Sequence, residues 1–218
     1  MDLSVEPKTV SQQVTKNLRK AIVQGSFRPG DRLVEASLCN QLGVSRPSLR
    51  EALRALEAEK LVVIRPNKGP SVALLTWDIA QQIYVVRALL EGEAAALAAR
   101  YASPEQIGVI QGALNAFGAA VESQNAQARI YSTEVFYAAL QQAGGNPVIT
   151  EVLRGLTSRI NFLRATSMGN GKRARDSFTE MRAILDAVEA NDADRARQAS
   201  MQHIQNAAIA AEAVFPHA

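Results

Sequence analysis

Residues 33–72 read LVEASLCNQLGVSRPSLREALRALEAEKLVVIRPNKGPSV, and this stretch decides the fold of the N-terminal part of the chain. Its apolar residues recur at helical spacing over about 35–42 and over 46–59, on either side of the turn Leu42-Gly43-Val44-Ser45. Two short helices joined by a tight turn that contains glycine indicate a helix-turn-helix, whose second helix enters the major groove of DNA. We therefore expect residues 46–59 to form a recognition helix.

The expected recognition helix has a defined start and a buried face. Ser45 precedes it and is a good N-cap, because its hydroxyl can accept a hydrogen bond from a first-turn amide that has no helical partner. Pro47 is tolerated in that turn, where its missing N–H removes no helical bond. Leu49, Leu53 and Leu56 are spaced to form one buried stripe.

Arg46, Arg50 and Arg54 follow at one-turn intervals on the face away from that stripe. From a helix in the major groove, arginines near the N-terminus reach guanine O6 and N7 or clamp phosphate oxygens. Ser45 and Ser48 add short hydrogen-bonding side chains at the same end, suited to contacts with the DNA backbone or bases. These residues are the expected DNA-reading surface.

An alternative is that this arginine face is only solvated, with support from Glu57 and Glu59, and Arg54 fits that description best because it lies furthest along the helix. The charge distribution bears on the choice. Residues 1–76 hold 12 Lys and Arg against 7 Asp and Glu, a net +5, whereas the other 142 residues hold 12 against 14, a net −2. A basic N-terminal part favours contact with a polyanion there, although ordinary surface charge would also give +5.

A β-hairpin is expected after the second helix. Leu61–Arg65 and Ser71–Leu74 are short β-rich runs joined by the turn residues Pro66-Asn67-Lys68-Gly69-Pro70. Such a hairpin is the wing of a winged helix. Lys68 and Gly69 at its tip are placed to approach phosphates or to enter the minor groove, since glycine allows close backbone contact. The alternative is an ordinary solvated hairpin tip.

Residues 10–75 resemble the DNA-binding domain of the GntR family of bacterial transcription regulators. The residues that carry the resemblance are Gly25, Pro29-Gly30-Asp31-Arg32-Leu33, Glu35, Leu42-Gly43-Val44-Ser45-Arg46, Leu49-Arg50-Glu51-Ala52-Leu53, Leu56-Glu57, Asn67-Lys68-Gly69 and Val72. The resemblance implies DNA contacts from Ser45, Arg46, Ser48, Arg50 and Gly69. It also implies that Glu35 supports the phosphate-facing helix.

From Thr76 onward the apolar residues recur with a helical period, and Gly, Pro and capping residues separate six segments. The expected helices span about 77–101, 104–123, 126–144, 147–167, 174–191 and 193–214, with N-caps at Thr76, Ser103, Asn125 and Asp192. Helices of this length pack as an antiparallel bundle whose interior can host a ligand. The expected fold is therefore mainly α: a winged helix-turn-helix with a small β-hairpin wing at residues 8–75 and an antiparallel six-helix bundle at residues 76–214.

The bundle resembles the FCD effector domain of the FadR-like branch of the GntR family, in its shorter, VanR-type six-helix variant. The matching residues are Arg87-Ala88-Leu89-Leu90-Glu91, Leu97-Ala98-Ala99, Phe136, Leu140, Ala143, Gly145-Asn146-Pro147, Arg182-Ala183-Ile184-Leu185, Asp192-Ala193 and His203. Many members bind a divalent metal through one Asp and three His. At those positions this chain has Thr133, Tyr137 and Met181, and it retains only His203. Since a first-row metal needs several nitrogen or oxygen ligands, we expect no metal and no cofactor.

The same residues are the expected effector site. The resemblance places an effector anion at Arg87, and Arg87, Tyr137 and His203 together offer a charge and directional hydrogen bonds to a small organic acid. Thr133 lies one helical turn before Tyr137 and shares its face, and Met181 completes the set. The alternative is that Tyr137 and Met181 only fill the space left by a metal site, with His203 a hydrogen-bonded core histidine.

The sequence thus predicts a ligand-responsive, sequence-specific transcription regulator that binds a pseudo-palindromic operator as a homodimer. Repression is expected, because it is the common mode in such families. The alternative is a constitutive regulator or architectural protein whose bundle only dimerises. An enzyme is not expected, because the 2 histidines, His203 and His217, have no nucleophile or carboxylate cluster at interpretable spacing. No membrane span or secretory signal is expected, and the single cysteine, Cys39, fits a reducing cytoplasm.

Overall fold

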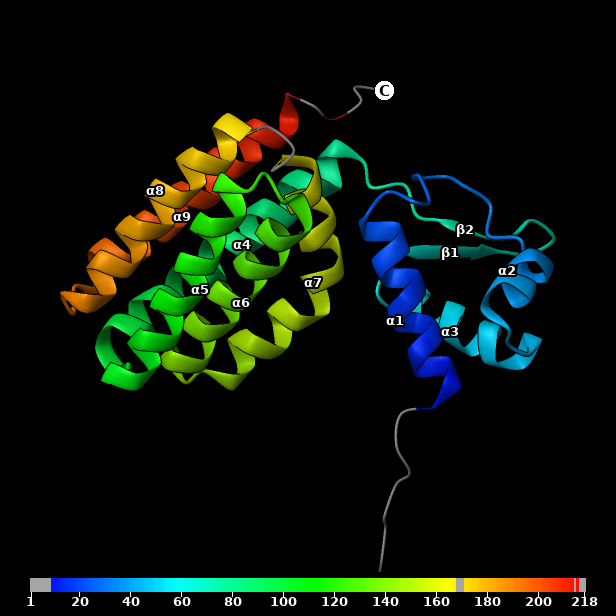
Figure 1. Cartoon of the computed structure of the whole chain (residues 1–218), viewed down its shortest axis with the longest axis horizontal. Coiled ribbons are helices and arrows are strands. Elements are labelled where there is room, and N and C mark those ends of the chain that lie inside the picture. Colours follow the sequence, from blue (N-terminus) through cyan, green and yellow to red (C-terminus); the bar gives the residue numbers. More distant parts are fainter. Residues whose placement is uncertain (1–8, 168–170, 214, 216–218) are drawn as a thin grey trace, which may run out of the picture. The chain divides into compact units, whose positions relative to one another are not determined.

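The computed structural model describes residues 9–167, 171–213 and 215, and the chain divides into two compact units, Met1–Leu75 and Thr76–Ala218 (Figure 1). The first unit contains α1 (Val10–Val23), α2 (Glu35–Leu42), α3 (Arg46–Ala58), β1 (Val62–Arg65) and β2 (Gly69–Val72). The second contains α4 (Trp77–Tyr101), α5 (Pro104–Glu122), α6 (Ala126–Gly144), α7 (Pro147–Ser167), α8 (Gly171–Glu189) and α9 (Ala193–Glu212). The expected fold class, a winged helix-turn-helix followed by a helical bundle, is confirmed.

The three helices of the N-terminal unit share one apolar core. Leu49, Leu53 and Leu56 of α3 are almost completely buried, as their spacing predicts, and they pack with Val14 and Leu18 of α1. Burying such side chains contributes about 1.5–3 kcal/mol each. Because this stripe faces inward, the opposite side of α3 is left to solvent.

The bounds of both strands of the wing differ from the expectation. The first strand begins at Val62, one residue later than expected, and the second is Gly69–Val72, not Ser71–Leu74, with Gly69 paired to Arg65 across the hairpin. The turn is shorter than the run of turn residues suggests, because Lys68 N–H donates to the Arg65 carbonyl over 3.2 Å and Asn67 takes a left-handed φ of 60°. Asparagine tolerates that conformation better than most residues.

The outer edge of the hairpin is also held. The Leu33 N–H donates to the Pro70 carbonyl over 2.9 Å, and Arg32 forms an isolated bridge with Ser71. The turn that precedes α2 therefore lies along β2, which fixes the wing relative to the helix-turn-helix.

The bundle is built around α4, which contacts α6, α7, α8 and α9, while α5 packs on α6 and α8. Short connections between successive helices make neighbours antiparallel (Figure 1). Alanines along α4 allow close approach: a Cβ on Gly144 of α6 would lie 2.9 Å from the Ala94 carbonyl oxygen. No described helix of the chain is long and apolar enough to cross a membrane.

Three of the four expected caps of the bundle form. The hydroxyl of Ser103 and the side-chain oxygens of Asn125 and Asp192 accept hydrogen bonds from first-turn amides, whereas Thr76 precedes α4 without a side-chain cap bond. The fifth bundle helix, α8, begins at Gly171 instead of Ala174 and ends at Glu189. Of the expected break Gly169-Asn170-Gly171, the structure includes Gly171 in α8, whereas Gly169 and Asn170 lie outside the described residues, as does the expected helix end at Val214.

Candidate DNA interface and effector site

The start of α3 is fixed by the two serines that the sequence singles out. Ser45 is the N-cap: its Oγ accepts a hydrogen bond from Ser48 N–H over 3.4 Å and lies 3.0 Å from Ser48 Oγ. The preceding helix α2 ends at Gly43, whose φ of 65° lets the chain turn sharply. Ser45 is exposed and Ser48 half-buried, so both side chains are accessible at the start of the helix that Ser45 caps.

Arg46, Arg50 and Arg54 are all exposed on the face of α3 opposite the core. Arg50 Nε lies 3.0 Å from Glu35 Oε2 on α2, an ion pair between side chains that are 62% and 27% exposed. A carboxylate would repel a phosphate group, but the Glu35 carboxylate is paired with the guanidinium of Arg50 on α3. Glu35 therefore acts on the arginine face by positioning Arg50.

Glu57 and Glu59, the carboxylates that could neutralise the arginine face, have other partners. Glu57 accepts a hydrogen bond from Ile64 N–H over 3.0 Å, and Glu59 accepts one from Arg19 Nε over 2.7 Å. Within the part of the chain that the structure describes, neither Arg46 nor Arg54 pairs with a carboxylate. In the structure, Glu57 and Glu59 therefore do not form ion pairs with Arg46 or Arg54, contrary to the interpretation in which they support these arginines.

The wing presents one cation at its tip. Lys68 is exposed, next to Asn67, and the following Gly69 is the first residue of β2 with a φ of 75°. A Cβ on Gly69 would meet no atom within 4 Å, so the position is open to an approaching surface. Its positive φ, more than lack of space, is what disfavours other residues there.

In the bundle, the sequence-predicted residues Arg87, Tyr137 and His203 lie close together and are each 2% exposed. The Tyr137 and His203 rings are stacked with centroids 6.1 Å apart. Arg87 Nε lies 3.1 Å from Glu91 Oε1. Arg164 of α7 lies 4.0 Å from the same oxygen, with its guanidinium carbon 5.1 Å from the centroid of the Tyr137 ring. Two guanidinium groups thus share one carboxylate beside an aromatic ring.

A second buried network surrounds Glu180 of α8. Its carboxylate accepts hydrogen bonds from Arg173 over 2.8 Å and from Asn206 over 2.7 Å, and lies 2.6 Å from His203 Nδ1. Burial alone would raise the pKa of Glu180, but the bonds to His203, Arg173 and Asn206 lower it to about 2. Burial lowers the pKa of His203 below its ordinary value, although Glu180 acts in the opposite direction.

Thr133 and Met181, the other two predicted effector residues, are also completely buried, on α6 and α8. The Thr133 hydroxyl is used locally, since it donates to the Arg129 carbonyl over 2.8 Å. The Tyr137 hydroxyl has no hydrogen-bond partner among the described residues. Burial, followed by the charge of Glu91, raises the pKa of Tyr137 far above its ordinary value, so the phenol stays protonated and can donate.

Comparison with known proteins agrees with both halves of this architecture. Residues 10–72 match the family of bacterial regulatory proteins, gntR family, and residues 82–206, more than half of the chain, match the FCD domain. The chain belongs to the GntR family. Its helix-turn-helix and its bundle are therefore a GntR DNA-binding domain and an FCD domain.

The relatives of this GntR-family chain are transcriptional regulators. The HTH-type regulator YdhC of Bacillus subtilis (strain 168) is 28% identical over 195 residues, which are 89% of this chain and 87% of that protein. The galactonate operon transcriptional repressor of Escherichia coli (strain K12) is 29% identical over 216 residues, 89% of this chain and 93% of that protein. The solved structure of E. coli McbR/YncC has the same fold, with a TM-score of 0.81 at 24% identity over 95% of this chain and 99% of that one.

The four side chains at the family's metal-ligand positions do not fit a divalent transition metal. Thr133 uses its hydroxyl in a backbone hydrogen bond, the pKa of Tyr137 is raised, and Met181 offers a thioether. Only His203 has a nitrogen ligand, and its Nδ1 already faces Glu180. One imidazole is too few for a first-row metal, and the two guanidinium groups beside Tyr137 oppose a further positive charge.

Four charged residues that lie beside the predicted ones were not among the expected effector residues. Glu91 and Arg164 join Arg87, whereas Glu180 and Arg173 join His203. Glu91 carried a local signal, because it lies four residues after Arg87 and so shares its helix face. The contact between Glu180 and His203 joins two helices and has no counterpart in local sequence spacing.

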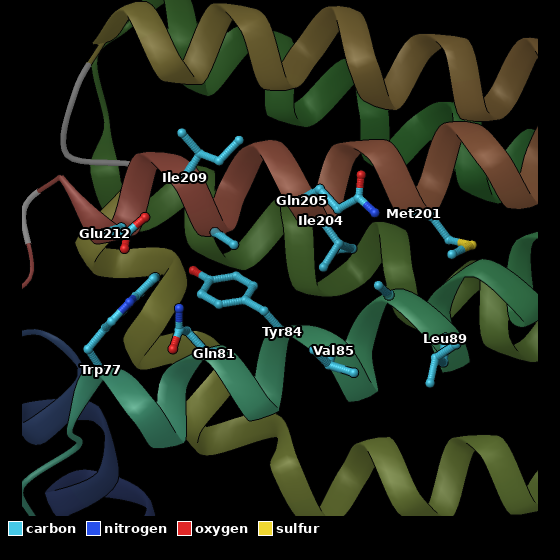
Figure 2. A pocket seen from close by; sticks show the side chains of 12 residues that line it. Trp77, Gln81, Tyr84, Val85, Leu89, Met201, Ile204, Gln205, Ile209 and Glu212 are labelled. Carbon is cyan, nitrogen blue, oxygen red and sulfur yellow. The ribbon is translucent and has the colours of Figure 1, made fainter.

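An apolar depression of about 380 Å³ lies along α4 and α9 of the FCD domain (Figure 2). Its lining includes Val85 and Leu89, each 60% exposed, and Ile209, 68% exposed. Tyr84 and Ile204 lie deeper in it and are buried. Because Gln81, Gln205 and Glu212 are its main polar side chains, this face of the bundle is largely hydrophobic and open to solvent.

Proposed function

We propose that this protein is a sequence-specific DNA-binding repressor whose operator affinity is modulated by a small organic acid bound in the FCD domain. The observation that carries the DNA-binding part is the capped helix α3 with three exposed arginines on one face. Arginine is the side chain best suited to bidentate contact with guanine in the major groove. Repression follows the name of the galactonate operon repressor, which is similar over most of its length.

The acid would be held at Arg87, Tyr137 and His203, with Thr133 and Met181 completing the walls. Arg87 and Arg164 both lie within ion-pair distance of the Glu91 carboxylate, so two guanidinium groups meet there. The Tyr137 hydroxyl, which has no hydrogen-bond partner among the described residues, is a donor beside the Arg164 guanidinium. An anionic acceptor would satisfy both the hydroxyl and the guanidinium groups. We propose that the site works without a metal, since its donors do not fit one.

A homodimer is the proposed binding species, because two recognition helices match the two half-sites of a pseudo-palindromic operator. We assign its contact to the α4 and α9 face that includes Val85, Leu89 and Ile209, which are exposed in the single chain. In a two-fold dimer this apolar face would pack against the same face of the second copy, and such a contact requires no pairs of opposite charges. Effector binding would then shift operator affinity by a coupling of about 1–3 kcal/mol.

A second candidate is a constitutive regulator whose bundle only dimerises. It is favoured by the ion pair between Arg87 and Glu91, which already neutralises the expected anion-binding residue. The two candidates differ in one measurement. An organic acid that raises the melting temperature of the protein and releases it from DNA supports the first, whereas operator binding unaffected by any acid in a broad panel supports the second.

The test of the DNA-binding function is fluorescence anisotropy with a duplex from the region upstream of the protein's own gene, against a scrambled duplex of equal composition. We expect a preference of about a thousandfold or more for the upstream duplex. Equal binding to both duplexes, lost steeply as salt rises, would indicate contacts to phosphates alone. That result across duplexes tiling the whole upstream region would contradict the proposal.

A further inference from the structure

A pocket of about 870 Å³ lies where α5 ends and where α6 and α8 begin. Its lining includes Val121 and Phe178, which are apolar, and Arg129, Arg175 and Thr179, which carry hydrogen-bond donors. None of the predicted effector residues lines it. Arg129 precedes Tyr137 by eight positions on α6, which corresponds to about 12 Å along the helix axis. The pocket is therefore separate from the Arg87, Tyr137 and His203 cluster.

Arg129 is the notable residue of this pocket. Its side chain is buried, with the residue 5% exposed, and Nε has no hydrogen-bond partner among the described residues. No described carboxylate lies within ion-pair distance of its guanidinium. An unpaired buried charge is costly in free energy, so such groups are normally paired. The Arg129 Nε–H, buried without a partner among the described residues, is therefore available to a group bound in the pocket.

The surroundings of Arg129 favour an anion. Arg175 is exposed at the same pocket and Glu122 is the one carboxylate in its lining, which gives the lining a net charge of +1. The first turns of α6 and α8 contain no acidic residue, so the positive ends of both helix dipoles are not neutralised there.

The apolar side of the pocket is shaped by one close contact. A Cβ on Gly118 would lie 2.9 Å from Cε2 of Phe178, so glycine lets this ring pack against α5. Phe178 and Val121 then offer an apolar wall opposite the basic groups. A ligand with a carboxylate at one end and a flat apolar body at the other suits such a lining.

We propose that this pocket binds a small aromatic or otherwise apolar carboxylate, with its charge on Arg129 and its body against Phe178. The site is additional to the proposed effector cluster. The proposal does not depend on the DNA-binding function, because every residue that lines the pocket belongs to the FCD domain. A carboxylate here would neutralise the buried guanidinium and so stabilise the fold.

The test is calorimetric titration of the full-length protein with benzoate, and with benzamide as its neutral counterpart of equal shape. We expect benzoate to bind in the millimolar range and benzamide to bind at least about tenfold more weakly, since hydrogen bonds to charged groups are the stronger ones. Arg129→Met should weaken benzoate binding by a similar factor, whereas Arg100→Met, at an exposed arginine of α4, should leave it unchanged.

A second readout separates a binding role from a structural one. Because Arg129 loses no ion pair on substitution, Arg129→Met should melt at the same or a higher temperature than the wild type in buffer without benzoate. Arg129→Lys, which keeps the charge, should retain part of the affinity. Benzoate bound equally by the wild type and Arg129→Met, no binding by the wild type, or a large loss of stability in Arg129→Met would each overturn the proposal.

Discussion

At the scale of single residues, the three arginines of α3 differ in whether a carboxylate orients the guanidinium group. Arg50 is oriented by Glu35, whereas no described carboxylate holds Arg46 or Arg54. A guanidinium that is already oriented loses less conformational freedom when it docks. Glu35 thus gives Arg50 a defined direction, and Arg46 is the first residue of α3, at the end that we propose enters the groove.

The first prediction concerns these two contacts. Arg46→Ala and Arg50→Ala should each weaken binding to the operator by about 1–3 kcal/mol if the side chain contacts a base. Neither should lower the melting temperature by much, because both side chains are exposed. The measurement is anisotropy of the variants on the operator duplex, with Arg100→Ala in the FCD domain as the control. Unchanged affinity in both α3 variants would falsify the assignment of α3 as the recognition helix.

The second prediction is a pH dependence from His203 and Glu180. A group whose folded pKa lies below its unfolded pKa stabilises the fold above the unfolded value, and this stability is lost as the pH falls through the folded value. His203 has a folded pKa below 6.5 and Glu180 one of about 2 against 4.5. Stability should therefore fall on acidification in two ranges, first below pH 6.5 and then below pH 4.5.

His203→Asn separates the two ranges, because asparagine can donate to Glu180 but does not titrate. The variant should lose the decline that starts near pH 6.5 and keep the decline below pH 4.5. The measurement is the melting temperature of both proteins from neutral to acidic pH. A variant whose curve runs parallel to that of the wild type would show that His203 is not the titrating group.

At the scale of elements, the tight contact between α4 and α6 depends on Gly144. A Cβ there would lie 2.9 Å from the Ala94 carbonyl oxygen and 3.0 Å from Leu97 Cβ, both on α4. Backbone cannot move aside as a flexible side chain can, so the helices themselves must separate. A glycine at the end of α6 is thus required by packing.

The third prediction follows from this contact. Gly144→Ala should destabilise the protein by about 1–3 kcal/mol through overpacking. Gly112→Ala is the matched control in α5, where a Cβ meets nothing within 4 Å. That change should stabilise the helix by about 0.5–1 kcal/mol, because alanine loses less backbone entropy than glycine. Urea unfolding measures both, and equal effects of the two substitutions would contradict the packing argument.

The helices and strands were easier to predict from the sequence than the contacts between side chains of different helices. Local signals fixed the capped starts at Ser45 and Ser103, because a cap is made within four residues of chain. The start of α8 was placed three residues late, at Ala174, since a helix can begin at glycine when packing favours it. Pairs such as Glu180 and His203 join different helices, and only the packing of the bundle shows them.

At the scale of the whole molecule, the two units divide the work that the family assignment implies. The N-terminal unit holds the exposed arginines of α3, and the FCD domain holds the buried charged networks around Arg87 and His203. In the proposed homodimer, the second unit would tether two copies of the first to the two half-sites of the operator. Two linked half-site contacts exceed one by about 10²–10⁴ in overall affinity when both engage.

The last prediction tests whether the α4 and α9 face supplies that link. Leu89 is 60% exposed on this face, whereas Val109 of α5, 57% exposed, lies outside it. If this face is the dimer contact, Leu89→Arg buries a charge without a partner in it, which costs about 3–5 kcal/mol. The variant should be monomeric by light scattering and should bind the operator at least about a hundredfold more weakly, with an unchanged melting profile of the single chain. Val109→Arg should keep both the dimer and the affinity. A Leu89→Arg protein that stays dimeric would place the contact on another face, because a charge buried in an apolar contact without a partner opposes association.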